Sequence, residues 1–134
     1  MITHLLDTSV YSQRLKRRPL KKVVRRWSDL GDARLAISTI CEAEILFGLE
    51  KKNSDRLWTE YEHYLKHKLI VLPLDRKVIE AYAGLKAGLQ AAGRTVGEFD
   101  LLIGATALAN NLKLATLNTK DFAKIPGLEV EDWG

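Results

Sequence analysis

Short apolar runs alternate with stretches of helical spacing along most of this chain. The apolar runs have the length of buried strands, and we expect strands over residues 2–6, 35–38, 69–72, 112–117 and 128–130. Most of these runs are apolar throughout rather than alternating with polar residues, so both faces of their sheet are expected to be covered. Such strands separated by helices predict an α/β fold: a three-layer α/β/α sandwich with a mainly parallel central sheet of four to five strands.

The segments between these runs carry apolar residues at spacings of three and four. We expect helices over residues 8–17, 20–30, 39–51, 54–66, 76–91 and 99–110, and a short turn over 119–122. Asp75 is the expected N-cap of the fifth helix, and Gly93 the expected stop after it. With 134 residues and no repeat or linker, residues 1–134 are expected to form a single domain.

Positive charge is concentrated in one block near the N-terminus. The net charge is only +4, yet residues 14–26 hold eight Lys or Arg residues and no acid. Such a block suits binding of a polyanion such as RNA, and a solvated helix face is the alternative. The expected RNA contacts are Arg14, Lys16, Arg17, Arg18 and, further along the chain, Arg94.

Several other classes of protein lack support in this sequence. The single cysteine, Cys41, excludes an internal disulfide framework and is predicted to be a small buried hydrophobe. His63 and His67 lie four residues apart without the HExxH order of zinc proteases, and phosphate-cradling glycine motifs and GxSxG are missing. No apolar run approaches the roughly 20 residues that cross a bilayer, and no signal peptide is evident, so a cytoplasmic protein is expected.

Four acidic residues lie in apolar settings: Asp7, Glu44, Asp100 and Asp121. Carboxylates are rarely buried unless they are paired or bind a cation. Sites in parallel sheets form beyond the carboxyl ends of the strands, and two of these acids follow expected strands. We therefore expect all four to converge at one rim and to bind Mg²⁺ or Mn²⁺. Hard oxygen ligands and such an ion are suited to phosphodiester cleavage.

Two glutamates compete for the second position of this site. Glu42 and Glu44 are two residues apart on one expected helix, so they point in different directions. Glu42 has a structural explanation, because Thr39 and Glu42 match a capping box with Thr39 as the N-cap. Glu44 has no such explanation and is the expected ligand.

The other acids also have structural alternatives. Asp7 can cap the helix that follows it, although the neighbouring Thr8 and Ser9 can also cap. Ser9 is in addition expected to hold Asp7 or a bound water in place. Asp100 can favour the positive end of its helix, and Glu98 can assist or replace it.

The last acid lies in a turn, where an exposed carboxylate is common. Asp121 is therefore either a surface residue or the final member of the acidic site. Asn118 and Thr119 are close enough in sequence to contribute a contact to water or phosphate.

Four fragments resemble sequences of a known family. They are similar to PIN-domain ribonucleases, and most of all to VapC toxins. The fragments are LLDTS around Asp7, EILFG from Glu44, FDLLIGATALANNLKLATLNTKDF, which starts at Phe99 and contains Asp121, and the ending IPGLEVEDW. The resemblance implies an α/β/α sandwich and a Mg²⁺- or Mn²⁺-dependent endoribonuclease. By motif position it implies that Asp7, Glu44, Asp100 and Asp121 are the catalytic and metal-binding acids. Some relatives place the last acid one or two residues earlier, where this chain has Thr119 and Lys120.

The resemblance also implies partners. VapC toxins pair with a VapB antitoxin, whose C-terminal segment lies across the acidic pocket and brings an Arg or Lys to the carboxylates. A homodimer and a toxin–antitoxin hetero-oligomer are implied as well, with residues 20–30 and 54–66 as a dimer surface. The stretch GRTVGEFD and the EDW ending resemble enterobacterial VapC toxins that cleave initiator tRNA in its anticodon stem-loop.

Two other functions remain open at this point. A non-catalytic RNA-binding module would need only the basic block. A receiver-like signalling domain also gathers acids and Mg²⁺ on a parallel sheet. It would have an adjacent acidic pair after the first strand, where this chain has Leu6, Asp7 and Thr8.

Overall fold

A five-stranded parallel sheet forms the centre of the computed structural model, which describes all 134 residues. The strand order is β3-β2-β1-β4-β5, and each strand is parallel to its neighbours. The strands are β1 (His4–Leu6), β2 (Leu35–Ser38), β3 (Ile70–Leu72), β4 (Lys113–Thr116) and β5 (Val130–Asp132). The predicted fold class is confirmed.

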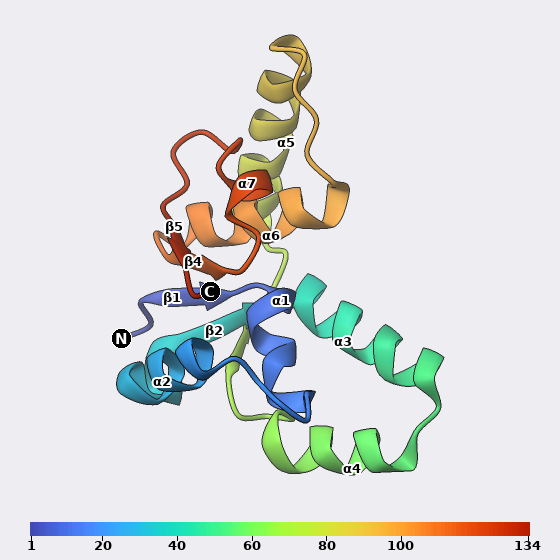
Figure 1. The fold of residues 1–134 in the computed structure, drawn as a ribbon. Helices are drawn as coiled ribbons and strands as arrows, with labels where there is room; N and C mark the ends of the chain where they lie inside the picture. The colour runs from blue at the N-terminus through green and yellow to red at the C-terminus, as the bar shows by residue number, and fades with distance from the viewer.

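Helices cover both faces of this sheet (Figure 1). The helices α1, α2 and α4 lie on one side, whereas α5, α6 and α7 lie on the other. The α-helices are α1 (Thr8–Tyr11), α2 (Lys21–Leu30), α3 (Thr39–Lys52), α4 (Asp55–Tyr64), α5 (Arg76–Ala91), α6 (Glu98–Ala109) and α7 (Thr119–Phe122). Two 3₁₀ turns, η1 (Ser12–Leu15) and η2 (Asp32–Arg34), complete the chain. None of these helices is long and apolar enough to cross a membrane.

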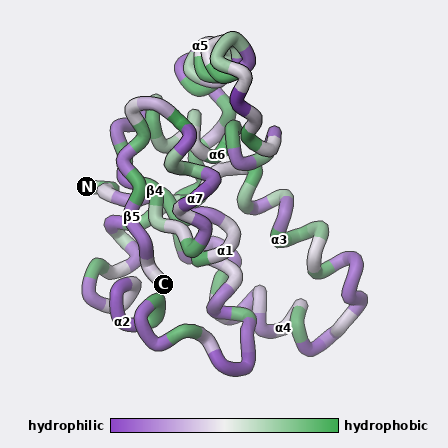
Figure 2. Tube along the Cα trace, turned by 45° about the horizontal axis from the view of Figure 1, so that its top comes forward, coloured by the Kyte–Doolittle hydropathy of each residue, from purple (hydrophilic) through white to green (hydrophobic).

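The core is divided by the sheet into two clusters. Consecutive strand residues point to opposite faces, so Leu6 joins the cluster around Trp27 while Leu5 joins the cluster around Phe122. Both residues are fully buried. Figure 2 shows mainly hydrophobic residues along β4 and α6 and mainly hydrophilic residues along α2. The absence of polar alternation in the sequence follows from this two-sided burial.

The helix expected over residues 8–17 is shorter than predicted. The α-helix ends at Tyr11, and a 3₁₀ turn continues to Leu15. Gln13 is buried there, and its side-chain oxygen accepts a hydrogen bond from the backbone N–H of Leu20 at 3.0 Å. Three consecutive cations and a proline follow the turn, and both features disfavour a continued helix.

The capping box predicted at Thr39 and Glu42 is wrong. Ser38 is the N-cap of α3, and its Oγ accepts a hydrogen bond from the backbone N–H of Cys41 at 3.0 Å. Glu42 therefore lies one residue beyond the position that a capping box requires. Cys41 itself is fully buried, and burial raises the pKa of its thiol to about 12, which agrees with the predicted role in the core.

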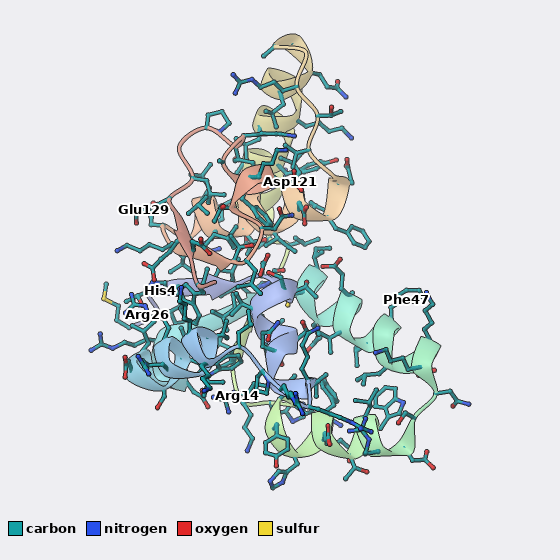
Figure 3. All side chains as sticks on the ribbon, in the orientation of Figure 1. His4, Arg14, Arg26, Phe47, Asp121 and Glu129 are labelled. Carbon is teal, nitrogen blue, oxygen red and sulfur yellow. The ribbon has the colours of Figure 1, made fainter.

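The last strand begins two residues later than expected and is fastened by a charged cluster. Glu131 in β5 accepts hydrogen bonds from Arg26 of α2 at 2.9 Å and from the Trp133 indole at 2.9 Å. His4 of β1 lies 3.2 Å from the other carboxylate oxygen. Burial alone would raise the pKa of Glu131, but these contacts lower it to about 2. Figure 3 shows His4 and Arg26 in this cluster, which ties the C-terminus to β1 and α2.

Candidate functional site

Asp7 lies directly after the central strand and is only 4% exposed. Its Oδ1 accepts hydrogen bonds from Ser9 Oγ at 2.6 Å and from the backbone N–H of Val10 at 3.0 Å, so Asp7 is also the N-cap of α1. Its Oδ2 accepts a hydrogen bond from Thr116 Oγ1 at 2.5 Å. Burial raises the pKa of this carboxyl, and the hydrogen bonds offset part of that effect. The side chain is thus oriented only by neutral donors.

Glu44 lies in the second turn of α3, a helix that contacts α1. Its Oε1 accepts a hydrogen bond from Thr8 Oγ1 at 2.6 Å, which links it to the residue next to Asp7. The expectation that Ser9 holds Asp7 is confirmed by the distance above. Thr8 was expected only as an alternative cap, and it instead orients Glu44.

Asp100 lies in the electrostatic field of the other three acids. It lies in the first turn of α6 and is half-buried. Its pKa is raised first by burial and then by the negative charges of Glu44, Asp7 and Asp121. Three segments that are distant in the sequence therefore place carboxylates within electrostatic range of Asp100, as the strand-end rule predicts.

Asp121 completes this group from α7, where Figure 3 labels it. Its Oδ2 accepts a hydrogen bond from the Asn118 side-chain amide at 2.8 Å, and Lys124 lies 3.8 Å from Oδ1. Asn118 thus orients this acid, as its position suggested. Thr119 begins α7 and makes no side-chain hydrogen bond to the acids. Glu98 lies apart from them in an ion pair with Lys86, at 3.0 Å.

The chemistry of this group suits a divalent cation. Asp7, Glu44 and Asp100 form no salt bridge with any Lys, Arg or His of the chain. All of their ligand atoms are carboxylate oxygens, which Mg²⁺ and Mn²⁺ prefer. No three acidic, His or Cys side chains stand close enough to hold one ion together as they are placed. Joint coordination by three of them would require their side chains to turn toward one another.

The repulsion at Asp100 leads to a stability prediction. A carboxyl whose pKa is raised in the folded state is destabilising when ionised, so its cost appears as the pH rises above the ordinary value of 3.8. In EDTA at pH 7, Asp100→Asn is expected to unfold at a higher temperature than the wild type, on the order of a few degrees. The difference should shrink as the pH is lowered toward 3.8.

Thermal unfolding across this pH range measures the effect. Glu62→Gln is the matched control, because Glu62 is exposed on α4 and outside the acidic group. It should change stability by no more than about 0.5 kcal/mol. A lower unfolding temperature for Asp100→Asn at pH 7 would contradict the repulsion.

A cavity of about 280 Å³ opens beside Glu44, between α1, η1, α3 and α4. Its rim carries Lys16 and Lys52, and its apolar lining includes Leu15 and Ile45. Lys16, one of the predicted RNA contacts, therefore shares a cavity with Glu44. This cavity offers an anionic ligand two cations beside one of the four acids.

The other predicted RNA contacts lie further from the acids or on the open surface. The Arg14 guanidinium lies 4.2 Å from the ring centre of Trp27, and Figure 3 labels it near the turn after α1. Arg17 and Arg18 are exposed. Arg94 lines a separate cavity with Lys86 and Glu98, before α6. Of the predicted RNA contacts, only Lys16 shares a cavity with one of the four acids.

Thr116 is the residue of this site that the sequence did not reveal. It ends β4, is fully buried, and bonds to Asp7 through the pairing of β1 with β4. Its hydroxyl also accepts a hydrogen bond from the backbone N–H of Asn118 at 2.8 Å. A buried threonine at the carboxyl end of a strand beside Asp7 is the signal that would have found it.

Comparison with known proteins finds matches over nearly the whole chain. The family model of the PIN domain matches residues 4–128. A protein of Haemophilus influenzae named ribonuclease VapC2 is 31% identical over 134 residues, covering 99% of each chain. A Shigella flexneri protein named tRNA(fMet)-specific endonuclease VapC is 30% identical over 134 residues, again covering 99% of each.

The solved structures include a close match in fold. The crystal structure of DNA-bound VapBC from Salmonella typhimurium superposes with a TM-score of 0.88 at 27% identity, over 100% of both chains. Sequence and fold therefore lead to one assignment along nearly the whole length. The chain belongs to the PIN-domain family, and within it to the VapC ribonucleases of toxin–antitoxin systems.

Proposed function

We propose that this protein is the toxin of a VapB–VapC-type pair and that it hydrolyses RNA phosphodiester bonds with Mg²⁺ or Mn²⁺. The observation that carries the proposal is the convergence of Asp7, Glu44 and Asp121 on Asp100. Together with the absence of any protein cation bonded to Asp7, Glu44 or Asp100, it favours a bound metal ion over a purely structural role for these acids.

The neighbouring side chains hold the acids in position for this chemistry. Ser9 and Thr116 orient the two oxygens of Asp7, and Thr8 orients Glu44. Asn118 holds Asp121 in the same way. When bound, a divalent ion supplies positive charge that neutralises the scissile phosphate and lowers the pKa of water. The carboxylates would hold that ion after their side chains turn toward one another, because no three of them can hold one ion as they are placed.

Lys16 and Lys52 are the proposed contacts for the RNA backbone beside the acids. Both line the cavity that contains Glu44, so they can bind phosphates adjacent to the reacting one. Arg14, Arg17, Arg18 and Arg94 would attract RNA from further away. Their exposure suits a long-range electrostatic role.

Lys16→Gln is expected to weaken RNA binding for all sequences alike and to reduce the salt dependence of binding by about one ion. The reason is the loss of one phosphate contact. Binding to a Mg²⁺-free RNA over a range of salt concentrations measures this slope. Lys77→Gln on α5 is the control, because Lys77 is equally exposed but outside the cavity. Equal slopes for the wild type and Lys16→Gln would remove Lys16 from the RNA site.

The proposed substrate is the anticodon stem-loop of initiator tRNA. The Shigella flexneri relative is named for that tRNA, and residues 93–100 resemble toxins of this kind. The direct test is to sequence RNA ends after inducing the wild type and Asp7→Asn in parallel. New ends within that stem-loop, formed only by the wild type, are expected. New ends elsewhere would keep the nuclease and replace the substrate.

The proposed protein partners are a VapB-type antitoxin and a second copy of this chain. An antitoxin Arg or Lys would neutralise the acidic group and exclude the metal ion. For the homodimer, Val24 of α2 and Tyr64 of α4 are exposed and line one cavity together with Trp27. Sedimentation of the free toxin and of the toxin with its antitoxin tests both assemblies.

A catalytically inactive RNA-binding module is the remaining alternative. It predicts RNA binding through the basic residues without cleavage in either metal ion. Cleavage by the wild type but not by Asp7→Asn would exclude it. The receiver-like alternative is set aside, because the PIN-domain match covers residues 4–128.

A further inference from the structure

Two phenylalanine side chains remain exposed beside the acidic group. Phe47 of α3 is 66% exposed and Phe99 of α6 is 51% exposed. Phenylalanine is among the residues most often buried, and burying its ring stabilises a fold by roughly 1.5–3 kcal/mol. These two exposed rings do not contribute that stabilisation to the fold. They lie on α3 and α6, the helices that supply Glu44 and Asp100.

The helix geometry directs Phe47 along the acidic group. It lies three residues after Glu44, so the two side chains are neighbours on the surface of α3. Ile40, seven residues earlier on the same face, packs against the core cluster that contains Leu101 of α6. This face of α3 is therefore turned toward α6. Figure 3 shows Phe47 on that side of α3.

Phe99 belongs to the helix that supplies Asp100. It lies next to Asp100 in the first turn of α6, and α3 and α6 are in contact. Glu44 and Asp100 are close enough for one to raise the pKa of the other, and each has a phenylalanine within three residues. The two exposed rings thus belong to the two helices that supply these acids.

The surroundings of Phe47 favour a single planar ligand over a protein helix. Its exposed neighbours on α3 are Ala43, Glu50 and Lys51, so the ring stands alone rather than within a wide apolar patch. On the other side of Glu44 lies the cavity with Lys16 and Lys52. A chain that passes Glu44 would meet cations on one side and an aromatic ring on the other. That combination matches a nucleic acid strand, with its phosphates and unpaired bases.

We infer that Phe47, assisted by Phe99, stacks on an unpaired base next to the phosphate held at the acidic group. This inference rests on the proposed nuclease function and assigns a positioning role to a residue outside the acids. Stacking needs an open base face, which paired bases inside a duplex do not offer. The rings would therefore select single-stranded or looped RNA and set its register on the carboxylates.

The test uses Asp7→Asn as an uncleaving background and a short unstructured RNA that contains one 2-aminopurine. Stacking on Phe47 is expected to quench the fluorescence of this base. Loss of a residue with a purely structural role would leave that quenching unchanged. Adding Phe47→Ala is expected to weaken binding about 5- to 100-fold and to abolish the quenching. Phe47→Trp should retain both, whereas Phe47→Leu, which keeps apolar area without a ring, should lose the quenching.

Ile79→Ala is the matched control, because Ile79 is a 43% exposed apolar side chain on α5, outside the acidic group and the cavities described above. It should leave affinity for this RNA within about twofold, as expected for a surface substitution. Equal losses for Ile79→Ala and Phe47→Ala would show a general effect of exposed apolar side chains and overturn the assignment.

A cleavage assay with Asp7 intact separates the possible failures. Phe47→Ala should raise KM for single-stranded RNA more than it lowers kcat. If the wild type cleaves RNA but Phe47→Ala binds and cleaves equally well, the stacking role is wrong and the nuclease function stands. If the wild type cleaves no RNA in Mg²⁺ or Mn²⁺, the nuclease function itself fails. If Phe47→Ala changes only inhibition by the antitoxin, the ring belongs to a protein interface and the inference is overturned.

Discussion

Replacing Asp7 with asparagine is expected to reduce RNA cleavage by at least about 1,000-fold, since loss of a metal ligand costs several kcal/mol of transition-state stabilisation. The protein should remain folded. An asparagine oxygen can still accept the hydrogen bonds from Ser9 and Val10 that now reach Oδ1. Its amide can donate to the hydroxyl of Thr116, which has a free lone pair. The substitution therefore removes the charge, keeps the two hydrogen bonds to Oδ1 and reverses the direction of the one to Thr116.

The cleavage rate of each variant tests this prediction, and its circular dichroism spectrum shows whether the variant is folded. Thr116→Val is the informative companion, because it keeps the carboxylate and removes its buried donor, together with the acceptor of the Asn118 backbone N–H. It should reduce activity less than Asp7→Asn does. Wild-type cleavage by a folded Asp7→Asn protein would show that the carboxylate has no part in catalysis.

Chelation of divalent ions is expected to abolish cleavage completely, and Mg²⁺ or Mn²⁺ should restore it. Binding to the folded state also raises stability, by about 2.7 kcal/mol when the ion is at 100 times its Kd. The unfolding temperature of the wild type should therefore rise with metal concentration. Asp7→Asn and Asp100→Asn should lose most of this rise because each removes an acid from the cleft.

Glu62→Gln serves as the control for a general effect of charge. It should show the same metal-dependent rise as the wild type, since Glu62 lies on the exposed surface of α4. Undiminished cleavage in EDTA would contradict metal dependence. A rise of equal size in Asp7→Asn would instead place the ion at a different site.

The elements that local sequence determines were predicted well. Helix α5 begins at Arg76 after the Asp75 cap and ends at Ala91, as expected, because a strong N-cap and a glycine with φ of 68° bound it. The apolar strands and their parallel order followed from two-sided burial. The N-cap of α3 was predicted wrongly, because Ser38 and Thr39 are both good N-cap residues. Only the position at which β2 ends decides between them.

The acids of the site were predicted from their apolar settings, whereas the residues that orient them were predicted only in part. Ser9 was accessible to sequence reasoning because it is two residues from Asp7. Thr116 is 109 positions away from Asp7, and a threonine at the end of a strand fits ordinary strand preference. Its role depends on the register of β1 against β4, which pairs Leu6 with Ala115. No local sequence pattern predicts the register between two strands that are far apart in the chain.

The central position of β1 has a consequence for protein synthesis. Its neighbour β4 and the edge strand β5 are synthesised after β1, β2 and β3. Until then Asp7 lacks its Thr116 donor, and Asp100 and Asp121 have not folded against it. A nascent or prematurely terminated chain therefore has no assembled acidic cleft. Each copy of the chain therefore gains its complete acidic group only after β4 and α7 have been synthesised.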